Sequence, residues 1–316
     1  MRLKPGRPDL HRHASRHDVA PAEAGALGVT FLGVSTLLVS DGASAVMTDG
    51  FFSRPGLLRV ALGRIAPSPG RIDAALARAL GDAGVAGLDA VVPVHSHYDH
   101  ALDSAVVAAR TGAPLLGGAS TANVGRGGGL AEDRVRTVAS GDVVGCGAFT
   151  LTFVASAHCP PDRYPGTIDA PLVPPARTAA YRCGEAWSLL VGHGPSGRTA
   201  LVQGSAGYVA GSLAGHRAEV AYLGVGQLGV QPEPYLEEYW EHTVRAVGAR
   251  RVVLTHWDDF FRPLDRPLRA LPYAGDDLDA TIRILDRLAT ADGVTVHLPT
   301  LWRREDPWSG LPGLPG

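Results

Sequence analysis

Four side chains that can bind a metal ion fall within six residues: His95, His97, Asp99 and His100. Three imidazoles and one carboxylate suit zinc and similar cations. The cluster follows an apolar run, residues 90–94, and precedes an expected helix, so we place it at a strand end that runs into a loop. Several side chains can turn toward one point there, whereas a helix would spread them. The spacing therefore predicts a metal site rather than a chance group of histidines.

Other candidate ligands stand at the ends of further expected strands. These candidates are Asp49, His158, Ser205 and His256. Strands are expected over residues 29–39, 45–48, 90–94, 114–116, 143–144, 149–154, 187–191, 199–202, 218–223, 251–255 and 294–298. Helices are expected over residues 72–80, 102–111, 236–247 and 278–289. Strand ends on one side of a sheet converge on one edge, so we expect a single site built from several segments.

Four other segments also carry predictions. We expect a loop over 51–70, a Gly-rich turn over 121–129, a long loop over 159–175 and a strand over 179–183. The 159–175 loop contains six prolines, and loops of this length are usually functional or disordered. Its candidate substrate contacts are Asp162, Arg163 and Tyr164, of which Arg163 could pair with a carboxylate or a phosphate. A plain solvated loop is the alternative interpretation.

Composition limits the class of protein. The chain has 316 residues, 45% of them hydrophobic, and a formal net charge of −2 at pH 7. Nucleic-acid binding usually needs a basic excess, so we expect a small-molecule substrate and no nucleic-acid partner. Three cysteines without a CxxC pair fit a reducing cytoplasm. The oligomeric state stays open.

The N-terminal region shows no targeting or membrane signal. The first 25 residues are polar and basic and lack the apolar core of a signal peptide. No stretch approaches the roughly 20 apolar residues of a membrane helix, so we expect no membrane association. We predict a polar arm over residues 1–27 and a single domain over residues 28–316.

From residue 29 to residue 256, the order of elements and ligands resembles the metallo-β-lactamase-fold metallohydrolase superfamily. Its H-x-H-x-D-H signature stands here at residues 95–100. The stretches 255–260 (THWDDF) and 204–207 (GSAG) are more similar to its lactonase-like and phosphodiesterase-like branches than to true β-lactamases. The resemblance implies an α/β (α+β) fold, a four-layer αββα sandwich with the metal site at one edge of its two sheets.

The resemblance also implies two sets of metal ligands. The first set is His95, His97 and His158; the second is Asp99, His100 and His256. Asp49 would orient a ligand or form a hydrogen bond near the metals. Asp258 and Asp259 could do likewise, or they could belong to a solvated turn or a helix cap.

One position departs from the family pattern. Many binuclear members carry a bridging aspartate where this chain has Ser205. A hydroxyl is a weaker ligand than a carboxylate, so the second site should be weaker than the first. We therefore expect one or two zinc ions, with manganese or iron accepting the same ligands. Ser205 could instead form a hydrogen bond to the nucleophilic water or the substrate, or serve only tight packing.

These observations favour a metal-dependent hydrolase acting on a small molecule. The substrate would be a lactone, amide, ester or phosphodiester, and a metal-bound hydroxide would attack it. Asp99 would orient the hydroxide and pass a proton to the leaving group. One alternative is a di-iron redox protein of the same fold, although such members typically have Glu where this chain has His97. The other is a catalytically weak metal-binding protein.

Overall fold

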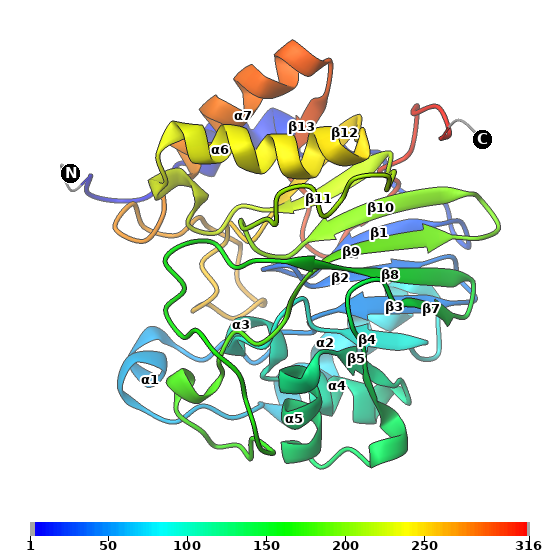
Figure 1. Cartoon of the computed structure of the whole chain (residues 1–316), viewed down its shortest axis with the longest axis vertical. Helices are drawn as coiled ribbons and strands as arrows, with labels where there is room; N and C mark the ends of the chain where they lie inside the picture. The colour runs from blue at the N-terminus through cyan, green and yellow to red at the C-terminus, as the bar shows by residue number, and fades with distance from the viewer. Residues whose placement is uncertain (1–3, 315–316) are drawn as a thin grey trace.

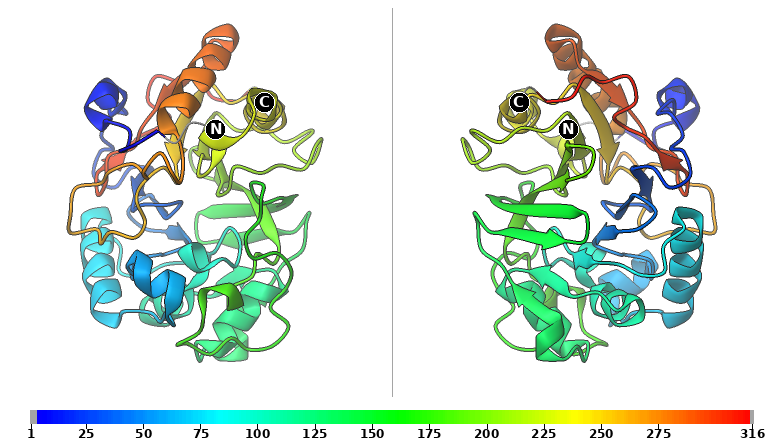
Figure 2. Two further views of the ribbon diagram at one scale, coloured as in Figure 1. Left: turned by 90° about the vertical axis from the view of Figure 1, so that its left-hand side faces the viewer. Right: turned by 90° about the vertical axis from the view of Figure 1, so that its right-hand side faces the viewer.

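The computed structural model describes residues 4–314 of the chain. Over this range the strands form two seven-stranded sheets. The inner faces of the two sheets share one apolar core, and helices cover the outer faces (Figures 1 and 2). The predicted four-layer αββα sandwich is therefore confirmed.

The first sheet is formed mainly by the N-terminal half of the chain. Its strands, in spatial order, are β14 (Arg304–Glu305), β1 (Gly28–Phe31), β2 (Leu37–Ser40), β3 (Ala45–Thr48), β4 (Ala90–Val92), β5 (Leu115–Gly117) and β6 (Val135–Thr137). The helices of this half are α1 (Leu57–Leu62), α2 (Pro69–Ala83), α3 (Tyr98–Ala101), α4 (Ser104–Thr111) and α5 (Ala119–Gly127). Strands β3 to β6 run parallel, so their carboxyl ends share one edge.

The second sheet is formed by the C-terminal half. Its strands, in spatial order, are β13 (Thr295–His297), β12 (Arg251–Thr255), β11 (Val220–Gly224), β10 (Arg198–Gln203), β9 (Ala186–His193), β8 (Phe149–Ser156) and β7 (Val143–Cys146). Its helices are α6 (Glu233–Trp240), which continues as a π-helical turn (Glu241–Arg245), and α7 (Leu278–Asp292).

Short 3-10 helices occur in both halves of the chain. They are η1 (Leu10–Arg16), η2 (Glu132–Arg134), η3 (Thr178–Ala180) and η4 (Leu228–Val230).

The side chains of the first sheet alternate between two apolar cores, one on each face of the sheet. Val46 and Val92 face the second sheet, whereas Met47 and Val91 face α2 and α4 on the other side. Successive strand residues point to opposite faces, so an alternating apolar pattern of this kind buries both faces of a sheet. Such a doubly buried sheet leaves its strand ends as the places where polar groups can gather.

Four local predictions from the sequence are wrong. Residues 29–39 form two antiparallel strands, β1 and β2, joined by a tight turn, instead of one strand. Residues 121–129 belong largely to helix α5 instead of a Gly-rich turn, because α5 packs on β5 and β6 and this packing outweighs the low helix propensity of glycine. The expected loop 51–70 contains helix α1. Residues 179–183 form a 3-10 turn and a loop in place of a strand. In that loop the Cys183 N–H donates a hydrogen bond to the Tyr164 carbonyl, and the Cys183 carbonyl accepts one from the Ser96 N–H.

The segment before β1 lies against the body of the protein. Val19 is 3% exposed and belongs to the core between the sheets. The backbone carbonyl of Arg16 accepts a hydrogen bond from Leu298, and Ala22 donates one to Arg304. Within the described residues, no helix combines the length and apolar character needed to cross a membrane.

Candidate metal centre

The histidine cluster lies where the chain leaves β4 and enters α3. His95 follows the strand, His97 is the N-cap of α3, and Asp99 and His100 lie inside this single helical turn. All four residues are buried. The expected position at a strand end is right for His95, but a turn of helix, not a loop, carries Asp99 and His100.

The remaining candidates arrive from other strands at the same edge. Asp49 follows β3, His158 follows β8, Ser205 follows β10 and His256 follows β12. Asp49 and His256 have left-handed backbone conformations, with φ of 57° and 61°. This conformation is uncommon outside glycine and turns the chain sharply at the strand end. The predicted convergence of strand ends therefore brings all of these side chains to one region.

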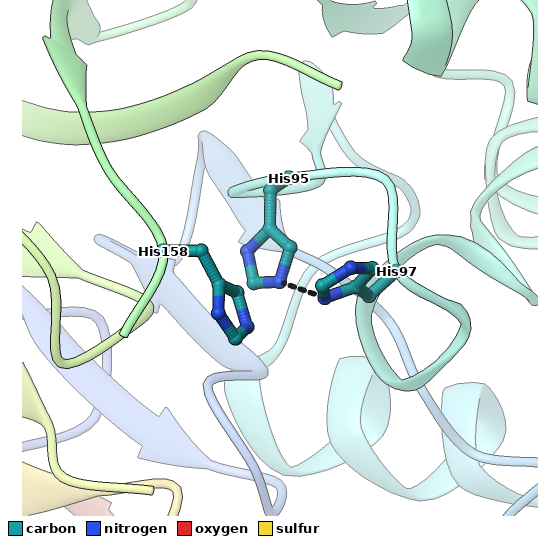
Figure 3. Close-up of side chains that lie close together, drawn as sticks. All are labelled: His95, His97 and His158. Carbon is teal, nitrogen blue, oxygen red and sulfur yellow. Dashed lines mark hydrogen bonds between the residues drawn. The ribbon is translucent and has the colours of Figure 1, made fainter. Parts of the chain in front are cut away.

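The first group consists of His95, His97 and His158 (Figure 3). One ring nitrogen from each of them lies within 4.8 Å of the others. The Nε2 atom of His95 is 3.1 Å from Nδ1 of His97. Three imidazoles converging in this way could hold one metal ion and leave a position open for water.

The second group consists of Asp99, His100 and His256, again with ligand atoms within 4.8 Å of one another. An Asp99 carboxylate oxygen lies 3.3 Å from Nε2 of His256 and 3.7 Å from Nε2 of His100. The two groups adjoin, because the His95 and His100 rings lie 3.9 Å apart between centroids. They are the same two ligand sets that the family resemblance implies.

Asp49 orients the ring of His100. Its Oδ2 atom lies 2.9 Å from His100 Nδ1, and its Oδ1 accepts a hydrogen bond from the backbone of Val94 at 2.9 Å. With the His100 proton on Nδ1, Nε2 carries the free lone pair. A carboxylate behind a metal-binding imidazole commonly has this role.

Burial of the ionisable side chains and their closeness to one another set the charge of the site. Burial lowers the pKa of His95 and His97, and lowers that of His158 to about 4. Burial alone would raise the pKa of Asp99, but His100 and His256 outweigh it and hold the pKa well below the usual range. Burial opposes a rise in the pKa of His100, but Asp49 and Asp99 outweigh it and raise that pKa. Neutral imidazoles and an ionised carboxylate are the forms that bind cations, and the shifts of His95, His97, His158 and Asp99 favour these forms.

The structure itself indicates that a cation fits among these side chains. Nε2 of His100 is buried and has no hydrogen-bond partner within the described residues. A buried polar nitrogen without a partner carries a desolvation cost of about 1–3 kcal/mol. Because this nitrogen faces Asp99 and His256, a bound cation would give it the missing partner.

A buried ion pair supports the strand end that carries His256. Arg54 Nη2 and Asp258 Oδ2 are 2.6 Å apart, and both side chains are fully buried. Asp258 also accepts a hydrogen bond from the backbone of Val34, whose carbonyl accepts from the backbone of His256. Asp258 thus lies behind His256 and outside the open cavity. The neighbouring Asp259 pairs with Arg269 and Arg7 at the cavity wall.

Ser205 links two of the converging segments. Its hydroxyl oxygen accepts a hydrogen bond from the backbone N–H of Cys159 at 3.0 Å. Cys159 directly follows His158, so this bond holds the His158 segment against the end of β10. Ser205 also borders the cavity above the two groups.

The 159–175 loop contributes differently at its three candidate positions. Asp162 lies 3.2 Å from Nε2 of His97 and accepts a hydrogen bond from the backbone of Tyr164. Arg163 and Tyr164 border the cavity, whereas Asp162 stands behind His97. A proton on Nε2 of His97 would point to the Tyr164 carbonyl, 3.3 Å away, with Asp162 beside it, leaving Nδ1 free to face His95.

Cys183 is a residue that the sequence did not single out. It forms a third possible ligand group with His97 and Asp162. Burial raises the pKa of its thiol well above the usual range, which disfavours the thiolate that a metal needs. No spacing signal pointed to Cys183, since backbone pairing between distant loops brings it to the site.

A cavity of about 890 Å³ opens above the two groups. His97, Asp99, His158, Ser205 and His256 form its floor. Segments that carry none of the candidate metal ligands supply much of its wall. These wall residues include Arg7, Leu57, Val60, Phe260, Phe261, Arg262 and Arg269. Residues 260–262 follow His256 closely in the sequence, and this closeness could have indicated that they border the cavity. Nothing in the sequence indicated Arg7.

The sequence matches no protein-family model and no curated protein. Its fold does match solved structures. The metallo hydrolase Igni18 from the archaeon Ignicoccus hospitalis KIN4/I is 16% identical over 88% of this chain and 96% of its own, with a TM-score of 0.50. A possible metal-dependent hydrolase from Veillonella parvula DSM 2008 is 12% identical over 88% of this chain and 98% of its own, with a TM-score of 0.53.

A third similar structure is that of CmlA, a diiron beta-hydroxylase from Streptomyces venezuelae. It is 13% identical over 89% of this chain but only 54% of its own, with a TM-score of 0.54. At this level of identity the likeness concerns the fold. The resemblance to the metallo-β-lactamase-fold superfamily is thus confirmed at the level of the fold.

Proposed function

We propose that this protein is a metal-dependent hydrolase of a small molecule, with zinc as the metal. The observation that carries the proposal is the pair of adjoining ligand groups at the floor of one open cavity. The metallo hydrolase and the possible metal-dependent hydrolase with the same fold support it.

The first group, His95, His97 and His158, would hold one ion, and the second, Asp99, His100 and His256, would hold another. A divalent cation bound there would supply Lewis acidity, lowering the pKa of a water molecule and polarising the scissile bond. The second group has one carboxylate, Asp99, and a serine where a bridging aspartate would add another. We therefore expect weaker binding of the second ion.

The chain's own residues position and move protons around this floor. Asp99 borders the cavity, so its carboxylate can orient an attacking water and accept a proton from it. The Ser205 oxygen already accepts the Cys159 N–H, which leaves its hydroxyl proton free to donate to a water or a substrate oxygen. Asp49 and the Tyr164 carbonyl hold the rings of His100 and His97 in place, and Asp162 lies beside His97.

The imidazole at position 97 favours hydrolysis over the di-iron alternative, because di-iron members of this fold typically carry a glutamate there. The match to a diiron hydroxylase still makes iron a necessary part of the metal analysis. Iron with a hydroxylase activity and no hydrolysis would favour the redox function.

Removing two ligands of the first group tests the proposal. The double variant His95→Ala/His97→Ala should lose the metal equivalent held by the first group, because only one imidazole of that group remains, and should keep at most the ion bound by the second group. Elemental analysis for zinc, manganese and iron measures this, and a screen of esters, lactones, β-lactams and phosphodiesters measures hydrolysis. His11→Ala, an exposed histidine outside the site, is the matched control. A double variant that keeps its full metal content would overturn the assignment.

A further inference from the structure

The wall of the cavity is rich in arginine. Four arginines border it: Arg7, Arg163, Arg262 and Arg269. They come from the N-terminal segment, the loop after His158 and the segment that follows β12. Distant parts of the chain thus bring the same type of charge to one cavity.

The carboxylates near these arginines neutralise only part of their charge. Asp259 pairs with both Arg7, at 3.3 Å, and Arg269, at 2.8 Å. Arg163 and Arg262 have no ion-pair partner among the described residues, and Nε of Arg262 is buried without a hydrogen-bond partner there. The other carboxylate that borders the cavity, Asp99, belongs to the second ligand group. The wall therefore keeps a positive surplus that a bound cation would increase.

The same cavity also has an apolar side. Apolar side chains from α1 and from the segment after His256 border it, namely Leu57, Val60, Phe260, Phe261 and Leu271. An apolar surface beside unpaired guanidinium groups is complementary to a molecule with one charged end and one apolar end.

We propose that the cavity takes a substrate that joins an anionic group, a carboxylate or a phosphate, to an apolar group. Arg163 and Arg262 bind the anion, and the apolar group lies against Phe260 and Phe261. Guanidinium groups match both anions with paired N–H donors, and the partly enclosed cavity strengthens this attraction relative to bulk water. This inference rests on the proposed function for the identity of the reaction, and it adds the class of substrate.

Binding of three small probes tests the proposal on the metal-loaded protein. Phenylphosphonate, phenylacetate and phenylacetamide share a phenyl ring and differ in charge, so calorimetric titration isolates the effect of the anion. We expect at least one anionic probe to bind about tenfold or more tightly than the neutral amide. The preferred anion identifies the substrate as a phosphate or a carboxylate.

Substitution of the unpaired arginines locates the interaction. Arg163→Gln/Arg262→Gln should lose about tenfold or more of the affinity for the preferred anion, whereas Arg163→Lys/Arg262→Lys should keep a clear preference for it. Arg59→Gln is the matched control, because Arg59 is an exposed arginine of α1 that does not border the cavity. Metal content and circular dichroism of each variant show whether the site and the fold are intact.

Two results would overturn the inference. One is equal binding of the anionic and neutral probes by the unmodified protein. The other is anion binding that the glutamine variant retains in full, since the metal alone would then account for it. Hydrolysis is a separate readout: if no ester, lactone, β-lactam or phosphodiester is cleaved, the proposed function fails, while the probe titrations still decide the anion preference.

Discussion

At the scale of single residues, Ser205 holds two of the converging segments together. Its hydroxyl accepts the Cys159 N–H and so holds the chain beside His158. A serine contributes no negative charge to the group of Asp99, His100 and His256. Cation affinity rises with the number of charged ligands, so we propose that the serine at this position limits how strongly the neighbouring group binds.

Ser205→Asp should raise the affinity for the second cation by on the order of tenfold, because the carboxylate adds an anionic ligand at the floor of the cavity. Elemental analysis after dialysis against buffers of limiting zinc measures the change in stoichiometry. Ser205→Ala is the control: it removes the hydrogen bond to Cys159, at a cost of about 1 kcal/mol, without adding charge. Equal stoichiometry in the two variants would place Ser205 away from the bridging position.

At the scale of elements, a buried carboxylate at the start of α4 fixes the segment that follows β3. Asp103 accepts hydrogen bonds from the backbone of Phe52 at 2.8 Å and from the backbone and hydroxyl of Ser53 at 2.6 Å each. Burial raises the pKa of Asp103 to about 6, although these bonds from Phe52 and Ser53 oppose the shift. The hydrogen bonds to Asp103 thus link the segment after Asp49 to the helix that follows the histidine cluster.

The raised pKa of Asp103 predicts a specific pH dependence. The folded protein binds the Asp103 proton more tightly than the unfolded chain does. The stabilisation that comes from this proton is therefore complete below about pH 4 and is lost as the pH rises through about 6. The free energy of unfolding of the unmodified protein should therefore fall relative to that of Asp103→Asn by on the order of 2–3 kcal/mol over this range.

Urea unfolding between pH 4 and pH 7 measures this difference. Asp82→Asn, which replaces an exposed carboxylate of α2, is the control and should show no comparable trend. A constant difference between the unmodified protein and Asp103→Asn would contradict the raised pKa.

At the scale of the whole molecule, the two ends of the chain join the two sheets. After β13 in the second sheet, the chain crosses to the first sheet and adds β14 beside β1. The N-terminal segment packs along this crossing, and Figure 2 shows its blue ribbon beside the red C-terminal segment. It carries Val19 into the core and Arg7 to the cavity. Residues 4–27 therefore contribute to both packing and the candidate site.

Deletion of residues 1–19 should lower the free energy of unfolding by several kcal/mol. Burial of Val19 alone accounts for roughly 1.5–3 kcal/mol, and the bond from Leu298 to the Arg16 carbonyl adds to it. Thermal and urea unfolding measure the loss. Arg12→Gln, which replaces an exposed side chain of η1, keeps this packing and should change stability by less than about 0.5 kcal/mol. A deletion variant as stable as the full chain would show that the segment is dispensable for folding.

The sequence by itself determined the local features of this protein. The spacing of His95 to His100, the apolar runs before each candidate ligand and the helical periodicity of α2 and α7 all depend on near neighbours in the chain. Local backbone preferences and apolar periodicity reflect the same near neighbours. For this reason the αββα fold and the two ligand groups followed from the order of the elements and its resemblance to a known family.

Only the tertiary structure decided which distant segments meet. It brought Cys183 beside Asp162, Arg54 beneath Asp258, and Arg7 to the cavity wall. It also made a helix of residues 119–127, whose glycines favour a turn when considered alone. These outcomes depend on packing between segments far apart in sequence, and neither periodicity nor spacing reports such packing. The residue types of the candidate ligands are therefore encoded in the sequence, while the way they meet and the charge and shape of the cavity above them arise from the fold.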